Sequence, residues 1–252
     1  MCLIVVAHKA NPDLPLVLAA NRDEFHARPT QEARWWADKP DILGGRDLQA
    51  GGTWLAIHRS GRFAAVTNYR DAAPKKGGLL SRGHLVTGFL ESTESPLDYL
   101  KSVETDRYDG FNLLVGDGEQ LAYSCNRDAV CRELPPGIYG VANASLDAPW
   151  PKVERSKAAL DQLLQPGGVN ETQLMRLLAD RKKAQAKEVV TGGLPFEKAH
   201  ALTAPFIVLP DYGTRCSTTL IRDGNGQLQF AEQRFDAGGK PLGQSNFQFS
   251  AS

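Results

Sequence analysis

Cys2 is the residue whose type and position point most directly to chemistry in this sequence. Methionine aminopeptidase removes Met1 when the second residue is small, so the mature chain would begin with this cysteine. Its thiol and its own α-amino group then share one residue, with ordinary pKa values of about 8.5 and about 7.7–8.0. Such an amine can take the thiol proton and activate the nucleophile without a separate histidine. The alternative is that Cys2 is a small buried residue at the start of a strand.

A second candidate is the polar run Asn21-Arg22-Asp23-Glu24, which directly follows the apolar residues 16–20. Turn-forming residues at 11–13 predict a hairpin between residues 3–7 and 16–20, and this pairing brings residues 21–23 beside the chain start. An arginine there would lower the pKa of the thiol, and an aspartate would hold the α-ammonium. Neighbouring strand residues point to opposite faces, so only one of Arg22 and Asp23 would face the thiol unless a bulge intervenes. The alternative is an exposed charged turn.

Most of the other predicted strands come in pairs joined by short turns. The pairs are residues 53–58 with 62–68, residues 111–115 with 120–124, and residues 217–222 with 227–233, and a further strand is predicted at 206–209. Turn dipeptides such as Asp117-Gly118 supply the positive φ that tight hairpins need. Strands joined in this way are antiparallel. Residues 26–52 are polar and irregular, with no predicted strand.

Four helices are predicted in two blocks. The first block has one helix capped by Ser81 and a second capped by Ser95 with Pro96 at its first position. The second block covers residues 152–164 and 171–184, with Asn170 as a cap. Residues 183–204 carry little pattern and predict a loop, a candidate cover for a site. This order predicts an α+β fold, a four-layer α-β-β-α sandwich of two mainly antiparallel sheets, formed by residues 1–252 as one domain.

The composition excludes several classes of protein. The 29 basic and 29 acidic residues balance, which argues against a nucleic-acid partner. The first apolar run is only five residues long and has no basic residues before it, so we expect neither a signal peptide nor a membrane span. The four cysteines fit no disulfide framework and no metal-ligand spacing, which indicates reduced thiols, a cytoplasmic protein and neither a metal nor a cofactor.

Several of these residues together resemble the NRDE family, also called transport and Golgi organisation protein 2. The resemblance rests on the opening Met-Cys-Leu-Ile, on Ala20-Asn21-Arg22-Asp23-Glu24, and on further motifs along nearly the whole chain, which are Gly44-Gly45-Arg46-Asp47, Gly51-Gly52-Thr53-Trp54-Leu55, Val66-Thr67-Asn68-Tyr69-Arg70 and Tyr212-Gly213-Thr214-Arg215. It implies an α-β-β-α sandwich and a link to lipid and acyl-CoA metabolism or to haem trafficking.

The chain also has a more distant resemblance to the choloylglycine hydrolase and penicillin V acylase group of N-terminal cysteine hydrolases. The resemblance implies Cys2 as the nucleophile, Arg22 and Asp23 beside it, Asn143 as an amide donor to the oxyanion, and Arg215 as a late arginine. In that group the arginine and the aspartate are separated, whereas here they are adjacent.

Two functions follow from these patterns. The first is hydrolysis of an amide or thioester bond in a small acylated substrate, with Asn21, Trp54, Asn68 and Tyr69 as substrate-binding residues. In this reading a backbone N–H at Asn68 or Tyr69 supports the oxyanion, and Trp54 walls the pocket. The second is a non-catalytic protein that binds haem, acyl-CoA or a lipid and passes it to a partner. A blander third reading is an interaction protein in which the polar motif only braces the fold.

Overall fold

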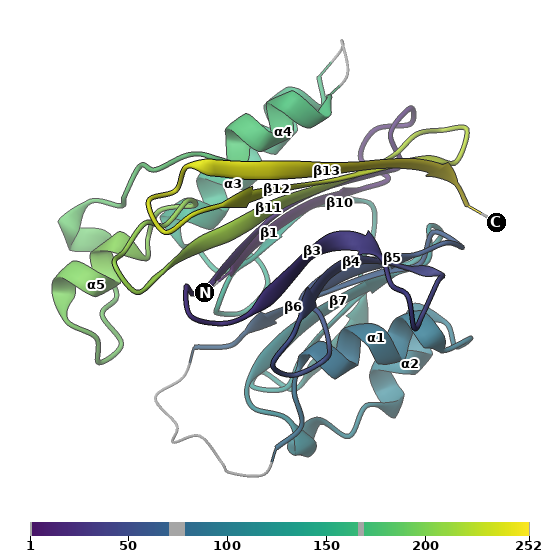
Figure 1. The fold of residues 1–252 in the computed structure, drawn as a ribbon, viewed down its shortest axis with the longest axis horizontal. Helices are drawn as coiled ribbons and strands as arrows, with labels where there is room; N and C mark the ends of the chain where they lie inside the picture. Colours follow the sequence, from purple (N-terminus) through teal and green to yellow (C-terminus); the bar gives the residue numbers. More distant parts are fainter. Residues whose placement is uncertain (1, 71–78, 166–168, 252) are drawn as a thin grey trace.

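Two antiparallel sheets lie face to face in this protein, with helices on both outer sides (Figure 1). The computed structural model describes residues 2–70, 79–165 and 169–251. The predicted four-layer α-β-β-α sandwich is therefore confirmed. Met1, whose removal the sequence analysis expects, lies outside the described residues.

The first sheet has six strands in the order β10-β1-β2-β11-β12-β13. Its strands are β1 Cys2–His8, β2 Leu16–Phe25, β10 Gly137–Val141, β11 Tyr212–Arg222, β12 Gln227–Phe235 and β13 Pro241–Ser250. The predicted hairpin of β1 and β2 is present, and β10 and β11 flank it on either side. Segments far apart in the sequence therefore surround the chain start.

The second sheet has seven strands in sequence order, from β3 to β9. Its strands are β3 Thr30–Trp35, β4 Ile42–Asp47, β5 Leu55–His58, β6 Phe63–Asn68, β7 Phe111–Gly116, β8 Leu121–Cys125 and β9 Val130–Glu133. The predicted hairpins of β5 with β6 and of β7 with β8 are both present. Neighbouring strands follow one another in the chain, and the long connection is that from β6 to β7, which contains the helices Gly83–Glu91 and Pro96–Ser102.

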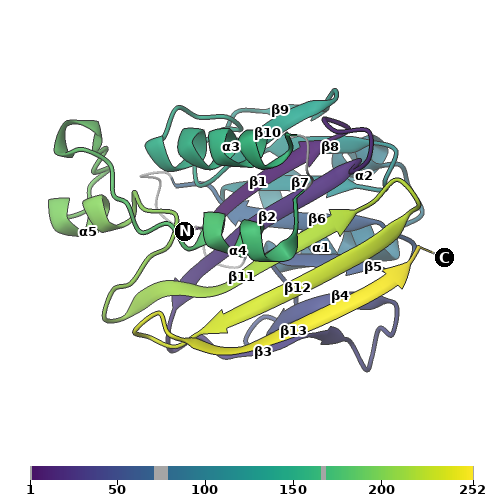
Figure 2. The same cartoon turned by 90° about the horizontal axis from the view of Figure 1, so that it is seen from above.

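Helices cover the outer face of each sheet (Figure 2). Helices α1 Gly83–Glu91 and α2 Pro96–Ser102 cover the seven-stranded sheet, and α3 Pro151–Leu163 and α4 Glu171–Leu178 cover the six-stranded one. Ser95 and Asn170 cap α2 and α4 as predicted, whereas α1 has Arg82 rather than Ser81 at its N-cap position. Short 3-10 turns lie at Thr105–Arg107 and Ala186–Glu188.

Side chains point alternately to the two faces of each strand, and this separates three apolar cores. One lies between the sheets and one lies between each sheet and its helices. On β1 and β2, Ile4 and Leu18 point into the core between the sheets, whereas Val5 and Ala19 point outward to α3 and α4. Burying one face of each sheet against the other and the opposite face against helices removes apolar surface from water on both sides. Cys2 belongs to the inward-pointing set, because it precedes Ile4 by two residues on the same strand.

Several sequence predictions differ from the structure. The helix predicted at residues 171–184 ends at Leu178. Residues 206–209 form a tight reversal with a single bridge between Val208 and Gly213, because the Ile207 N–H donates to the Thr214 hydroxyl at 2.9 Å instead of to a neighbouring strand. Strands β3 and β4 lie in the stretch predicted to be irregular, where polar residues and Gly44-Gly45 hide the alternation. Residues 183–204 contain a short helix, α5 Phe196–Ala201.

All four cysteines are free thiols, with Cys2 half-buried, Cys125 and Cys216 buried, and Cys131 exposed. Among the described residues, the helices are all too short or too polar to cross a bilayer.

Candidate active site

Cys2 and Arg22 are direct neighbours across the first two strands. Arg22 lies opposite Cys2 in the antiparallel register, and directly paired residues point to the same face of a sheet. Both side chains therefore point between the sheets. Arg22 is only 5% exposed, and its guanidinium lies 4.3 Å from the ring centroid of Trp54 and donates to the Thr30 hydroxyl at 3.0 Å. These contacts hold a permanent positive charge beside the thiol.

Asp23 lies at the same strand end but points to the outer face. Its backbone N–H donates to the Cys2 sulfur. The Thr214 hydroxyl donates to Asp23 Oδ1 at 2.7 Å, and the Tyr212 hydroxyl donates to the Asp23 carbonyl at 2.7 Å. Asp23 is one register step beyond the Cys2–Arg22 pair, at the end of β1 where the nitrogen of Cys2 lies. The thiol thus faces Arg22, whereas the nitrogen end of Cys2 faces Asp23.

Asn143 follows β10, which pairs with β1 on the side away from β2. Ile4 pairs with Val141, and continuing this register by two residues brings Asn143 level with Cys2. The Asn143 side chain is buried, and its Nδ2 donates to the Asn68 carbonyl at 2.8 Å. One Nδ2 hydrogen remains to donate elsewhere. Asn143 therefore joins the start of β1 to the end of β6 on the opposite sheet.

A buried polar network fixes the segment that carries Asn143. Tyr123 accepts from the Leu146 N–H at 3.1 Å and donates its hydroxyl to Asn112 Oδ1 at 2.6 Å. Asn112 donates to the Thr67 hydroxyl at 3.1 Å, and Thr67 donates to the Ala142 carbonyl at 2.5 Å. Networks of this kind resist displacement because each buried group would lose its partner. The seven-stranded sheet therefore positions a residue that follows a strand of the six-stranded sheet.

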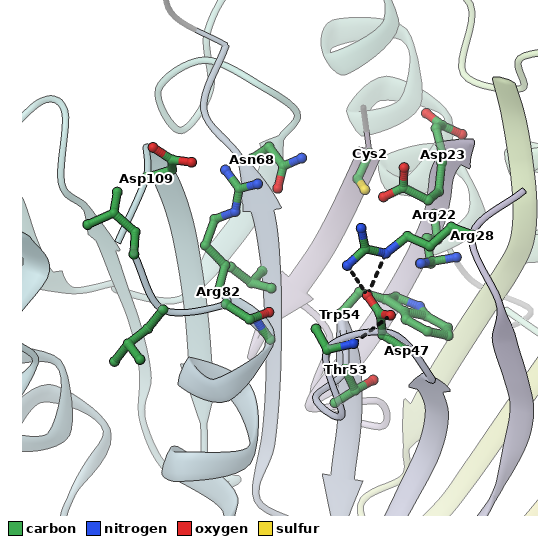
Figure 3. A pocket seen from close by; sticks show the side chains of 17 residues that line it. Cys2, Arg22, Asp23, Arg28, Asp47, Thr53, Trp54, Asn68, Arg82 and Asp109 are labelled. Atoms are coloured by element: carbon green, nitrogen blue, oxygen red, sulfur yellow. Dashed lines mark hydrogen bonds and ion pairs between the residues drawn. The ribbon is translucent and has the colours of Figure 1, made fainter. Parts of the chain in front are cut away.

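Cys2 opens onto a pocket of about 350 Å³ between the two sheets (Figure 3). Asn68 lies on one side of Cys2 in this view, with Arg22 and Asp23 on the other. Seventeen residues line the pocket: Cys2, Arg22, Asp23, Glu24, Arg28, Asp47, Ala50, Thr53, Trp54, Val66, Asn68, Leu79, Leu80, Ser81, Arg82, Gly83 and Asp109. The lining is strongly charged, which suits a polar or ionic group on a ligand better than a purely apolar one.

Two glycines make room for this lining. A Cβ on Gly45 would lie 2.3 Å from the Trp54 ring, and a Cβ on Gly52 would lie 2.6 Å from the carbonyl carbon of Gly83. Both separations are below any ordinary contact distance. Gly45 thus allows the ring to lie under Arg22, and Gly52 allows the start of α1 to approach the pocket. One glycine of each pair in the sequence motifs thus has a steric reason.

The electrostatics of the thiol depend on opposing effects. Burial raises the pKa of the Cys2 thiol, and the Asp23 carboxylate raises it further, whereas Arg22 lowers it. Burial also raises the pKa of the Asp23 carboxyl to about 6. Burial raises the pKa of Cys216 well above its ordinary value, and nearby Glu232 adds to this effect. Cys216 lies opposite Arg22 on β11, so it shares the neighbourhood without lining the pocket.

Three predicted site residues have other surroundings. Asn21 is buried and has a structural role. Its Nδ2 donates to the Leu178 and Pro205 carbonyls at 2.9 Å each, and its Oδ1 accepts from Ser217. The backbone N–H of Tyr69 donates to the Gly110 carbonyl at 2.9 Å, so it does not face an oxyanion. Neither residue lines the pocket around Cys2, and the predicted Asn143 does not line it either.

Arg215 is the third predicted residue that the structure places away from the thiol. It is the extra residue of a β-bulge in β11, between Thr214 opposite Asp23 and Cys216 opposite Arg22. Its Nη1 donates to the carbonyls of Phe25, His26 and Arg28 at 3.0–3.2 Å. It does not line the pocket. The geometry therefore indicates that Arg215 braces the turn after β2 rather than the nucleophile.

Sequence reasoning missed three cationic residues near the thiol. Arg28 lines the pocket and forms an ion pair with Asp47 at 2.7 Å, and Arg82 lines it while donating to the Gly110 carbonyl at 3.0 Å. Lys152, at the start of α3, is buried and interacts electrostatically with Asp23 and Cys2. Arg28 follows the NRDE run closely enough to have been a candidate. Nothing in the local sequence marks Arg82 or Lys152. Across the described residues, no three His, Cys, Asp or Glu side chains cluster as a metal site would require.

The architecture is that of the N-terminal-nucleophile hydrolases. Two variants of the conjugated bile acid hydrolase from Clostridium perfringens each superpose with a TM-score of 0.51 at 8% sequence identity. The first match covers 100% of this chain and 97% of that one, and the second covers 99% and 98%. At this identity the likeness concerns the fold alone.

Residues 1–237 match the family described as Transport and Golgi organisation 2. The Transport and Golgi organization protein 2 homolog of Bos taurus is 35% identical over 263 residues, and that of Homo sapiens is 34% identical over 265 residues. Each match covers 92% of this chain and 92% of the relative. The chain belongs to the Transport and Golgi organisation 2 family, which confirms the resemblance found in the sequence.

Proposed function

We propose that this protein is an N-terminal-nucleophile hydrolase that uses the Cys2 thiol on an amide or thioester bond of a small acylated substrate. The observation that carries the proposal is the placement of Cys2, whose thiol faces Arg22 at a pocket while its nitrogen end faces Asp23. Loss of Met1 would turn that nitrogen into a free amine. In a chain that keeps Met1 the nitrogen is an amide, which cannot act as a base.

The proposed reaction has two stages. The α-amine of Cys2 takes the thiol proton, the thiolate attacks the substrate carbonyl, and a tetrahedral oxyanion forms. The amine proton then passes to the leaving nitrogen or sulfur as the carbonyl bond to it breaks, leaving an acyl thioester on Cys2. In the second stage the amine takes a proton from water, hydroxide attacks the thioester, and the acid and the free thiol are released.

Two amide side chains support the oxyanion in this scheme. Asn143 retains one Nδ2 hydrogen beyond its bond to Asn68, and the exposed Asn68 side chain lines the pocket next to Cys2. A well-placed donor of this kind contributes about 3–4 kcal/mol to the transition state. The Asn68 side-chain amide replaces the backbone N–H of Tyr69 in the earlier expectation, because that N–H is already bonded.

The charged pocket supports an anionic group on the substrate. Arg22, Arg28 and Arg82 all line it, and of these only Arg28 forms an ion pair with a described carboxylate within 4 Å. Guanidinium groups bind carboxylates and phosphates through paired hydrogen bonds. An acyl compound that carries such a group at a distance from the scissile bond would fit this arrangement.

A non-catalytic role is the second candidate. The observation that favours it is the raised pKa of the Cys2 thiol, since burial outweighs the effect of Arg22 in the unprocessed chain. A protein that only binds haem, acyl-CoA or a lipid needs the pocket and its arginines but no ionised thiol. The two candidates therefore differ in whether Cys2 reacts.

Alkylation kinetics separate the two functions. The purified protein is first shown by intact mass to lack Met1, and then treated with limiting iodoacetamide at pH 7, followed by peptide mapping. We expect Cys2 to react at least tenfold faster than the exposed Cys131, which serves as the internal control. A variant with Gly inserted before Cys2 has an amide in place of the amine and should react more slowly. Equal labelling of Cys2 and Cys131 in the folded protein would favour the binding function.

A further inference from the structure

Lys152 is a buried lysine that neither the sequence motifs nor the proposed reaction uses. It is the second residue of α3 and is 1% exposed. Its Nζ has no hydrogen-bond partner among the described residues, and the ring centroid of Trp150 lies 6.0 Å away. Burying an ammonium group without hydrogen bonds is costly, so its retention here calls for a compensating interaction.

The compensating charge lies on the outer face of the six-stranded sheet. Helix α3 packs on β1 and β10 at that face, and Asp23 points to it from β2. The pKa of Lys152 is lowered by burial, raised by the Asp23 carboxylate and the Cys2 thiol, and lowered by Arg70. The Asp23 carboxylate and the Cys2 thiol, on β2 and β1, thus act on this ammonium. Arg70, which follows β6, is the opposing cation, and Glu188 lines the same cavity as Lys152.

The arrangement addresses a conflict within the proposed reaction. A lone Asp23 carboxylate beside the α-amine of Cys2 would stabilise the ammonium form, and an ammonium cannot accept the thiol proton. A second cation next to Asp23 offsets this effect. It also favours the thiolate directly, because every proton bound to the cluster becomes less favourable when a positive charge is present.

We propose that Lys152 is a positioning residue for the Cys2 nucleophile. Its buried ammonium acts through Asp23, keeping that carboxylate charged and turned toward the α-amine while leaving the amine able to accept the thiol proton. This inference rests on the proposed function, because it concerns the same nucleophile. Lys152 does not line the pocket around Cys2, so it has no role in contacting substrate there.

A second cavity gives room for a conservative test. Lys152 lines a cavity of about 230 Å³ together with Arg70, Trp150 and Leu202, on a different side from the pocket of Cys2. A longer side chain at position 152 can extend along this cavity without displacing β1. The variant Lys152→Arg therefore keeps the positive charge, whereas Lys152→Met removes it at similar volume.

The test measures the rate of Cys2 alkylation by iodoacetamide between pH 5.5 and 9, in protein that lacks Met1. We expect Lys152→Met to raise the midpoint of the pH profile by about one pH unit, which slows alkylation at pH 7 by about tenfold. Lys152→Arg should restore the wild-type midpoint. Lys157→Met is the matched control, because Lys157 lies on the same helix but pairs with Asp147 at 2.6 Å. It should leave the profile unchanged.

The outcomes distinguish this inference from the proposed function. A wild-type Cys2 that reacts no faster than Cys131 contradicts the proposed function itself. A reactive wild-type Cys2 whose profile is the same in Lys152→Met overturns the role of Lys152 alone. If Lys152→Met fails to fold, the wild-type protein carries the test through ¹⁵N spectra of its lysine side chains. Alkylation of Cys2 should then move the titration midpoint of Lys152, the one buried lysine among the described residues, and an unmoved midpoint would overturn the inference.

Discussion

Replacing Asp23 with asparagine removes a carboxyl group whose pKa burial raises from 3.8 to about 6. The folded state holds this proton more tightly than the unfolded state does. The proton's contribution to the free energy of unfolding is therefore fully present below about pH 4 and is lost as the pH rises through about 6. Each pKa unit corresponds to about 1.4 kcal/mol. The ionised carboxylate therefore costs the fold up to about 3 kcal/mol at pH 7, and asparagine never incurs this cost.

The assay is urea denaturation of the wild-type protein and of Asp23→Asn at several pH values between 4 and 7. Asparagine still accepts a hydrogen bond from Thr214, so the part of the difference that comes from packing stays constant with pH. We expect the free energy of unfolding of the variant, relative to wild type, to rise by about 2–3 kcal/mol from pH 4 to pH 7.

Asp38→Asn is the control. Asp38 is an exposed carboxyl whose hydrogen bonds with Arg46 lower its pKa, so its replacement should change the relative stability in the opposite direction. A relative stability of Asp23→Asn that stays flat, or that falls as the pH rises, would refute the reasoning. It would mean that folding does not raise the pKa of the Asp23 carboxyl above its unfolded value.

Two further substitutions test the remaining assignments. Asn143→Ala should lower kcat by about 10²–10³-fold with little change in KM, measured with any amide or thioester that the protein hydrolyses, because it removes an oxyanion donor that acts in the transition state; a change confined to KM would contradict this role. Arg215→Ala should lower the free energy of unfolding by about 1–3 kcal/mol, because three carbonyls lose their donor. It should leave the rate of Cys2 alkylation within about twofold of wild type, and a large loss of reactivity would return Arg215 to the site.

The layers of this fold could be predicted because they depend on local patterns. The hairpin of β1 and β2 and the caps Ser95 and Asn170 all follow from residues close together in the sequence. Strands β3 and β4 could not be read in this way, because their pairing partners rather than their own alternation define them. Strand β4 contains Gly44 and Gly45. Glycines weaken a strand, so this pair argues against a strand when the sequence is read alone.

The site was predictable only where strand pairing fixes it. The predicted hairpin brings residues 21–23 beside Cys2, and the structure pairs Arg22 rather than Asp23 with it. Asn143, which the register of β1 and β10 brings level with Cys2, was proposed only through the resemblance to a hydrolase group. Arg215 lies in a single-residue bulge that is invisible in the sequence, so its direction could not be predicted. Lys152 enters from a helix packed on the sheet, and no spacing rule connects it to Cys2.

The strands that pair with β1 lie far along the chain, and this limits the time in which an aminopeptidase could remove Met1. β1 lies between β2, whose partner β11 ends at Arg222, and β10, which ends at Val141, so the six-stranded sheet can close only after most of the chain has left the ribosome. At about 5–20 residues per second, synthesis to that point takes on the order of 10–40 seconds. An aminopeptidase needs a free, extended chain end, and in the finished protein Cys2 is half-buried at the start of a central strand. The proposed function therefore requires that Met1 be removed from the nascent chain, before the six-stranded sheet closes around Cys2.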